Sequence, residues 1–234
     1  MLSETLLRIS ERTKKLNLET YLFDNLTNDS PGIRMKEDES SILKFLDDTH
    51  KNRYYLFGLG KHNSWKKVQS LLRTERNGVI SSFISTLSPS PRLNLFLLRN
   101  IGVNIEKPYL GNYEKGDLEV SVATHCTFDY FFPELISVGY GTHFGLQCIV
   151  ATHANQIDYW AIGTVDIGRN VFIGARSIIG PGAIIGDNAK INVGSVVYDE
   201  VPEGRIFEGN PAKDKGQRKF RDVKIYKGIP KIES

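Results

Sequence analysis

Aliphatic residues recur at every sixth position through much of the C-terminal half of the chain. The series consists of Ile167, Ile173, Ile179, Ile185, Ile191 and Val197. Glycine follows each of the first four members, and asparagine follows the fifth. A compact residue lies two positions before each later member: Val171, Ser177, Ala183, Ala189 and Ser195. Three positions of a six-residue unit therefore repeat together, which indicates a repeat architecture.

A period of six excludes an amphipathic α-helix, whose faces repeat every 3.6 residues, and a plain strand, whose faces repeat every two. It fits a prism of short parallel strands. The aliphatic residue of each unit then points into a narrow interior and the compact residue fits a crowded corner. Glycine and asparagine suit the turns between strands. We therefore predict a mainly β fold built of stacked coils.

A second block of the same repeat lies upstream, at Val138, Phe144 and Val150. The two blocks are out of phase, because the interval from Val150 to Ile167 is one position short of three repeat units. Residues 152–164 contain polar side chains and no convincing repeat unit. We expect them to form a loop extruded from the coil, where binding groups tend to lie.

The N-terminal part, residues 1–99, is predicted to be a largely helical arm or cap. From Ser64, a candidate N-cap, apolar residues recur at helical spacing to Leu87, and the segment 88–91 ends the pattern with two prolines. The apolar positions are Trp65, Val68, Leu71, Leu72, Val79, Ile80, Phe83, Ile84 and Leu87. We expect this apolar face to dock on the main domain and the basic residues to face solvent. An anionic membrane surface is the alternative partner.

Composition places the chain among ordinary globular proteins. Hydrophobic residues make up 40% of its 234 residues, and 30 basic against 27 acidic residues give a net charge of +3. This balance does not favour nucleic-acid binding, and no apolar run approaches the ~20 residues of a membrane span. Cys126 and Cys148 lie among apolar residues, and no signal-peptide pattern opens the sequence. We expect a cytoplasmic protein with two free cysteines in its interior.

Several segments resemble the hexapeptide-repeat acyltransferases, which include the maltose and galactoside acetyltransferases. The similar segments are 165–175, 179–189, 194–197 and 208–213, where the last reads Glu-Gly-Asn-Pro-Ala-Lys. Asp129–Ile136, followed by Ala151-Thr152-His153, resembles the branch related to polysaccharide-modifying acetyltransferases. The resemblance implies a left-handed parallel β-helix over residues 100–214. A partly helical N-terminal extension, residues 1–99, would precede it, and a basic tail, residues 215–234, would follow.

The resemblance also implies that His153 is the catalytic base of an acetyl transfer to a hydroxyl group. Histidine suits this role because its proton equilibrium lies near neutral pH. A carboxylate or a carbonyl should orient the imidazole, and Asp129, Glu134 and Asp158 are the candidate carboxylates. Members of this branch often have glutamate after the histidine, whereas this chain has Ala154. That departure leaves the binding of the acceptor open.

The family's donor is acetyl-CoA, which lies between neighbouring subunits of a homotrimer. The matching cofactor positions here are Gly174, Ala175, Ser195, Asn210, Pro211 and Lys213. Arg218 belongs to the basic tail that follows, for which the alternatives are contact with the phosphates of CoA and simple exposure to solvent. Lysine and arginine suit the phosphates of CoA. For the acceptor, expected to be a sugar or another small hydroxylated molecule, we predict contacts from Asn155, Tyr159, Trp160 and Glu134.

Two alternatives share this fold. A zinc enzyme like the γ-carbonic anhydrases would need three histidines, and His125, His143 and His153 are available. The interval from His125 to His143 equals three repeat units, so these two would stack on successive coils if no insertion intervenes. The other alternative is a CoA-binding or scaffold protein without turnover, which Ala154 favours. We expect the acetyltransferase, with no metal.

Overall fold

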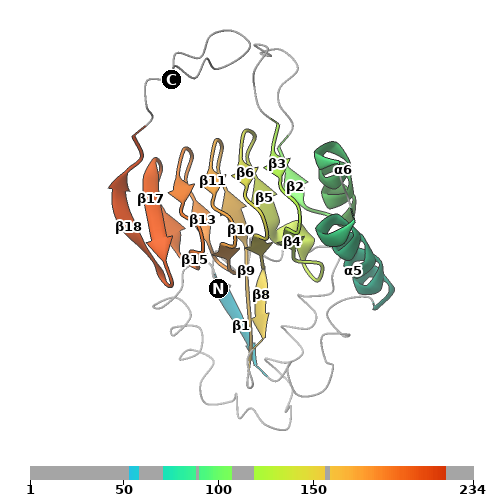
Figure 1. Cartoon of the computed structure of the whole chain (residues 1–234). Coiled ribbons are helices and arrows are strands. Elements are labelled where there is room, and N and C mark those ends of the chain that lie inside the picture. The colour runs from blue at the N-terminus through green and yellow to red at the C-terminus, as the bar shows by residue number, and fades with distance from the viewer. Residues whose placement is uncertain (1–52, 58–70, 88–89, 107–118, 156–158, 220–234) are drawn as a thin grey trace, which may run out of the picture.

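Short strands are stacked into a parallel β-helix with three sheets (Figure 1). The computed structural model describes residues 53–57, 71–87, 90–106, 119–155 and 159–219. The first sheet contains β2 (Asn104–Ile105), β5 (Ile136–Val138), β10 (Val165–Ile167), β13 (Ile184–Ile185) and β16 (Glu200–Val201). The second contains β3 (Ser121–Val122), β6 (His143–Phe144), β11 (Phe172–Ile173), β14 (Lys190–Ile191), β17 (Arg205–Gly209) and, antiparallel to β17, β18 (Ala212–Gln217). The third contains β4 (Thr127–Phe128), β7 (Ile149–Val150), β12 (Ile178–Ile179) and β15 (Val196–Val197).

The sixth-position aliphatic residues form the core, as predicted. In the first sheet Val138, Ile167 and Ile185 are aligned on successive coils, and the equivalent residues of the other two sheets are aligned in the same way. Every member of the series from Val138 to Val197 is buried. The compact residues of the repeat are also buried. Stacking therefore buries one continuous apolar column along the axis, which no single coil could do alone.

Small polar side chains close the corner that precedes the third sheet. The thiol of Cys126 donates to the carbonyl of Gly145 at 3.1 Å, and the thiol of Cys148 donates to that of Gly174 at 3.2 Å. One coil further, the Ser177 hydroxyl donates to the carbonyl of Asn192 at 3.0 Å. Each side chain thus occupies a buried corner and pairs with backbone. Both cysteines are free, as expected.

The segment expected to leave the coil is a β-hairpin. Its strands are β8 (His153–Asn155) and β9 (Tyr159–Gly163), and β1 (Arg53–Phe57) pairs antiparallel with the other edge of β9. Figure 1 shows these three strands extending away from the coils. The arm predicted to be largely helical therefore contains a strand, whose Arg-Tyr-Tyr-Leu-Phe sequence is rich in aromatic residues that favour strands.

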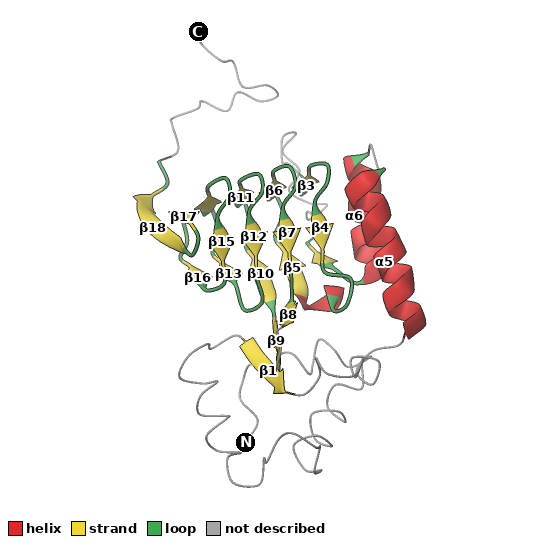
Figure 2. Ribbon diagram, turned by 60° about the horizontal axis from the view of Figure 1, so that its bottom comes forward, coloured by secondary structure: helices red, strands yellow, loops and turns green. Residues whose placement is uncertain are grey.

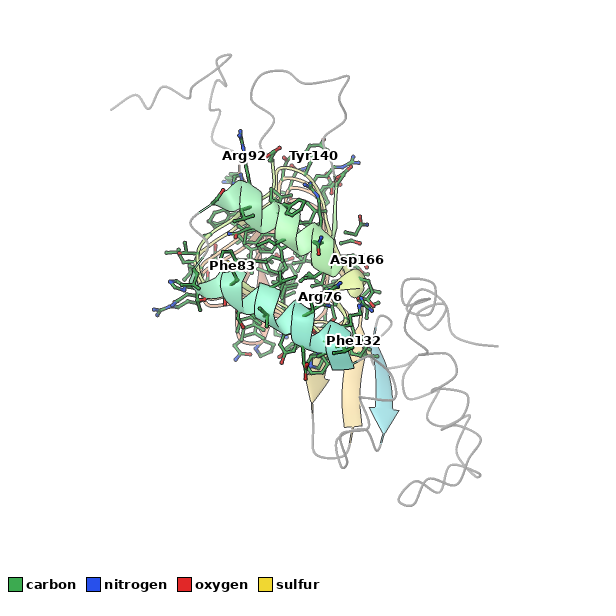
Figure 3. The ribbon with its side chains drawn as sticks, turned by 90° about the vertical axis from the view of Figure 1, so that its right-hand side faces the viewer. Arg76, Phe83, Arg92, Phe132, Tyr140 and Asp166 are labelled. Atoms are coloured by element: carbon green, nitrogen blue, oxygen red, sulfur yellow. The ribbon has the colours of Figure 1, made fainter. Side chains whose placement is uncertain are left out.

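Two helices cover the N-terminal end of the β-helix (Figures 2 and 3): α5 (Leu71–Thr86) and α6 (Pro91–Ile101). The expectation that residues 88–91 end the helical region is wrong. Ser90 caps α6, since its hydroxyl accepts from the Leu93 N–H at 3.4 Å, and Pro91 occupies the first turn, where no N–H is needed. Within the described residues, no helix is long and apolar enough to cross a membrane.

The expectation that α5 docks through its apolar face is also wrong. Leu72, Val79 and Leu87 are 78%, 72% and 71% exposed, whereas Thr74, Asn77, Ser81 and Ile84 are buried. The reason is that α5 packs on β4, which has no strand partner on that side within the described residues. An open edge presents backbone carbonyls that need donors. Asn77 Nδ2 donates to the carbonyl of Tyr130 at 3.3 Å, and the Ser81 hydroxyl donates to that of Phe128 at 3.1 Å.

Two glycine substitutions should have opposite effects on stability, because a Cβ would clash between coils at one position and would fit inside a helix at the other. A Cβ at residue 139 would lie 2.6 Å from the backbone carbon of Gly168, so Gly139→Ala should lower the free energy of unfolding by about 1–3 kcal/mol. A Cβ at residue 78, inside α5, would meet only Tyr130, with Cδ2 at 3.7 Å. Gly78→Ala should therefore stabilise the protein by about 0.5–1 kcal/mol. Urea denaturation of both variants tests this, and equal effects would contradict it.

Candidate active site

Stacking of the third sheet brings Asp129 and His153 together. Phe128 of β4 is aligned with Val150 of β7, and the Asp129 N–H donates to the carbonyl of Val150 at 2.8 Å. Asp129 follows β4 directly, and His153 is the first residue of the hairpin that leaves the coil. The two side chains therefore meet at the corner where the regular coil is interrupted.

The carboxylate of Asp129 is completely buried and accepts hydrogen bonds at both oxygens. Oδ2 accepts from His153 Nδ1 at 2.5 Å, and from the Thr152 N–H and hydroxyl at 2.8 Å each. Oδ1 accepts from the N–H groups of Phe131 and Phe132 at 2.7 and 3.3 Å. Since the carboxylate accepts from Nδ1, the imidazole carries its proton there and has Nε2 as its basic nitrogen.

The surroundings of Asp129 keep it ionised. Burial alone would raise the pKa of this carboxyl group, but the charge of His153 and the hydrogen bonds from His153 and Thr152 outweigh burial. The net effect lowers the pKa of Asp129 below its ordinary value of 3.8. A negative charge is therefore held against the imidazole.

Two aromatic rings from the 128–134 segment, which carries Asp129, lie against the imidazole. The Phe131 ring lies 4.8 Å from the His153 ring, centroid to centroid, and the Phe132 ring lies 6.0 Å away with an edge-on orientation. The His153 side chain retains 20% of its exposure. The arrangement places a half-buried imidazole against a buried carboxylate, a geometry that suits general-base catalysis.

Glu134, predicted to contact the acceptor and also considered as an orienting carboxylate, pairs with α5 instead. Its carboxylate accepts from Arg73 Nη2 at 2.8 Å and from Nη1 at 3.3 Å. Burial raises the pKa of Glu134 and outweighs the opposing charge of Arg73. Asp129 is therefore the carboxylate that the structure places on His153.

The remaining acceptor candidates belong to the hairpin. Asn155 ends β8 and is aligned with Trp160 of β9, while Tyr159 begins β9. Their side chains, and Asp158 as a whole, lie outside what the structure describes. Ala154 is aligned with Ala161 across the hairpin.

Most of the predicted cofactor residues gather at the corner between the second and third sheets. The Ser195 hydroxyl accepts from the Gly209 N–H at 3.2 Å, which ties this corner to the turn that contains Asn210 and Pro211. That turn joins β17 to β18 (Ala212–Gln217), on which Lys213 is exposed. The carbonyl of Ala175 accepts from the Gly194 N–H at the same corner, and Gly174 lies beside it.

Arg218 does not join these residues. Its Nη1 lies 3.1 Å from each of the carbonyls of Asn170, Asn188 and Ala189, at the corner between the first and second sheets. Residues 215–217, assigned to the basic tail, belong to β18, and residues 220–234 lie outside the described structure.

His125 and His143 do not stack, because an insertion intervenes between them. His143 is aligned with Ser121, because the coil that contains the 3₁₀ turn Pro133–Leu135 is four positions longer than three repeat units. The Nδ1 atom of His125 lies 2.7 Å from the carbonyl of Ser85 in α5. In the described part of the chain, no group of three or more His, Cys, Asp or Glu side chains is placed to hold a metal ion.

Comparison with known proteins identifies the family. The family model described as bacterial transferase hexapeptide (six repeats) matches residues 164–199. The protein SAS0727 of Staphylococcus aureus, named as a candidate acetyltransferase, is 33% identical over 170 residues, which cover 73% of this chain and 95% of SAS0727. This chain belongs to the hexapeptide-repeat acetyltransferases. The family resemblance found in the sequence is therefore confirmed, as are the left-handed parallel β-helix class and the assignment to the acyltransferases.

Other members of the family match parts of this hexapeptide-repeat acetyltransferase. The galactoside O-acetyltransferase of Lactococcus lactis is 27% identical over 184 residues, covering 72% of this chain and 86% of that enzyme. YvoF of Bacillus subtilis is 42% identical over 85 residues, so the match spans 36% of this chain and about half (49%) of YvoF. The maltose O-acetyltransferase structure from Clostridium difficile 630 aligns at a TM-score of 0.45 with 24% identity, covering 65% of this chain and 90% of that one.

Sequence reasoning missed several residues of this acetyltransferase that contact the 128–134 segment, which carries Asp129. They are Thr152, which shares Asp129 with His153, and Arg73, Asn77 and Ser81 on α5. The α5 residues follow each other at intervals of four, so they form one stripe on the helix. That spacing of polar residues is a usable signal, but the apolar stripe of the same helix is easier to recognise.

The pKa of Asp129 predicts how stability depends on pH. A carboxyl group whose folded pKa is lowered contributes stability above its unfolded pKa, and loses it as pH falls through the folded pKa. The free energy of unfolding should therefore decrease as the pH falls below about 4. In Asp129→Asn this acid-side decrease should shrink, and stability at pH 7 should drop by about 1–3 kcal/mol.

Urea denaturation between pH 3 and pH 7 measures both effects. Asp214→Asn is the control. The carboxylate of Asp214 also accepts a hydrogen bond from a side chain, that of Arg205, but it lies at the surface. Its curve should stay close to that of the unmodified protein. An Asp129→Asn curve parallel to the original at all pH values would show that Asp129 is not held as a carboxylate.

Proposed function

We propose that this enzyme transfers an acetyl group from acetyl-CoA to a hydroxyl group of a sugar, with His153 as the general base. The observation that carries the proposal is the buried Asp129–His153 pair at the corner where the hairpin leaves a β-helix of the acetyltransferase family. The galactoside O-acetyltransferase among the relatives supports a sugar as the acceptor.

The chemistry follows from the hydrogen bond between Asp129 and Nδ1. That bond fixes the tautomer in which Nε2 accepts the proton of the acceptor hydroxyl while its oxygen attacks the thioester carbonyl. A C–O bond forms, and the negative charge moves to the carbonyl oxygen of a tetrahedral intermediate. When the intermediate collapses, the C–S bond breaks, and the proton held by the imidazolium passes to the sulfur of the departing CoA. The products are the acetyl ester and CoA thiol.

Asp129 and the neighbouring rings each have a part in this step. The carboxylate is ionised and in contact with Nδ1, so it stabilises the positive charge that develops on the imidazole during proton transfer. Phe131 and Phe132 limit the access of water to the imidazole. Exclusion of water strengthens the interaction between the two charges.

The donor would bind at the corner that contains Ser195 and the turn at Asn210 and Pro211. Backbone groups near Gly174 and Ala175 would hold the pantetheine arm. Lys213 is exposed beside the turn, so its ammonium group could pair with a phosphate. Arg218 is less suited to the donor, because the carbonyls of another corner already surround it.

A homotrimer with active sites between subunits would complete this arrangement. Large apolar side chains are exposed along the second and third sheets and the corner between them. They are Leu146, Ile149, Phe172, Val193 and Tyr198. A patch of this kind on a protein surface favours association with another protein surface. We place the enzyme in the cytoplasm, because its two cysteines are buried and free.

The test is CoA release from acetyl-CoA, followed with a thiol reagent over a panel of sugars and small alcohols. His153→Ala should lower kcat by about 10²- to 10⁴-fold, because the reaction loses its base. His143→Ala is the matched control and should keep the original rate, since His143 lies on the second sheet. Loss of rate in both variants, together with bound zinc, would support the zinc enzyme and contradict the proposal.

A third result would support neither the acetyltransferase nor the zinc enzyme. If the purified protein binds acetyl-CoA but releases no CoA with any acceptor on the panel, the proposed reaction fails, and the chain is a CoA-binding protein without turnover. Calorimetric titration with acetyl-CoA separates this outcome from a protein that does not bind the donor.

A further inference from the structure

Three residues of α5 bind the segment that carries Asp129. The Ser81 hydroxyl donates to the carbonyl of Phe128, and Asn77 Nδ2 donates to the carbonyl of Tyr130, so both neighbours of Asp129 are held. Further along the segment, Arg73 forms its ion pair with Glu134. Because the three α5 residues are four positions apart, one face of one helix makes all these contacts.

The same segment is fixed from the other side by the Asp129 carboxylate. Its Oδ1 atom accepts from two backbone N–H groups of the segment, and Oδ2 accepts from Thr152 and from His153. A continuous series of contacts therefore leads from α5 through the 128–134 segment to Asp129 and on to the imidazole. A shift of the segment would change the distance and angle of the Asp129–His153 hydrogen bond directly.

Two of the α5 residues place buried donors against this segment. Asn77 is 0% exposed and Ser81 is 4% exposed, and each donates to a backbone carbonyl next to Asp129. The Asn77 amide is itself oriented, since its Oδ1 accepts from Arg76 Nη2 at 3.0 Å and its Nδ2 then faces Tyr130. Figure 3 shows Arg76 and Phe132 toward the same end of α5, with Phe83 toward the other.

We propose that α5 is a positioning element of the active site, in which Arg73, Asn77 and Ser81 hold the 128–134 segment so that Asp129 orients His153. The proposal rests on the proposed function, since orientation matters only if His153 acts as a base. It assigns a catalytic consequence to the N-terminal extension, which lies outside the repeat. Small displacements of reacting groups have large effects on rate.

Asn77→Ala is the decisive variant, and Asn94→Ala is its matched control. Both asparagines are buried in the two-helix cap, but Asn94 belongs to α6, and its Oδ1 has no partner among the described residues. Urea denaturation measures the stability that each variant loses, so that activity is compared under conditions in which both are folded. Only Asn77→Ala should lower kcat, by about ten- to a hundredfold, with little change in the KM for acetyl-CoA.

The role of α5 can be tested separately from the proposed acetyl transfer by measuring the protonation of His153, which needs no substrate. Nitrogen NMR of ¹⁵N-histidine-labelled protein reports which imidazole nitrogen is protonated, and the His153 signals are assigned by their absence in His153→Ala. In the unmodified protein and in Asn94→Ala, the proton should be on Nδ1. In Asn77→Ala, the His153 signals should shift toward a mixture of tautomers.

The outcomes are distinct. If Asn77→Ala retains both the Nδ1–H signature and the kcat of Asn94→Ala, α5 is only a cap and the proposal is overturned. If the signature changes but even the unmodified protein has no turnover, α5 positions His153 and the proposed reaction is what fails. Should Asn77→Ala not fold, Ser81→Ala removes a single hydroxyl group and is examined by the same two measurements.

Discussion

Alignment of one coil on the next is the constraint on which the rest of the structure depends. The backbone ladder aligns Phe128 with Val150, and this alignment brings the residues after each strand to one corner. Asp129 from one coil then meets Thr152 and His153 from the next, although 24 positions separate Asp129 from His153 in sequence. The site is therefore a product of the repeat, and anything that alters the spacing of coils alters the distance between the imidazole and the carboxylate.

The buried charge at this corner is possible because the backbone is already arranged to receive it. An isolated carboxylate in an apolar interior would be neutralised or would destabilise the fold. Asp129 instead accepts from three backbone N–H groups, one hydroxyl and one imidazole. The same hydrogen bonds that stabilise its charge also determine where the imidazole points. The stability of the corner and the orientation of the imidazole thus depend on the same hydrogen bonds.

The β-helix was predictable from the sequence because its core has a period that no other regular element has. The position of His153 at the corner was predictable because it stands where that period breaks, and Asp129 was among three candidates. The cap was not predictable in the same way. Its apolar stripe indicated a buried face, but the unpaired edge of β4 needs donors, so Asn77 and Ser81 face inward and Val79 faces out. The 3₁₀ turn at Pro133–Leu135 similarly lengthened one coil, which invalidated spacing arguments for His125 and His143.

The hairpin of β8 and β9 leaves the coil after Thr152 and returns at Thr164, and the third sheet resumes without loss of alignment. From β7 to β12, the coil that includes the hairpin is much longer than the regular coil from β12 to β15, yet both pairs of strands are aligned in the same way. An insertion at this corner thus leaves the core, the ladder and the Asp129–His153 pair intact. Descendants of such a chain can exchange the part of the hairpin beyond His153 for one of another length or sequence while they inherit the coils and the Asp129–His153 pair unchanged, so this corner can diversify as a separate module.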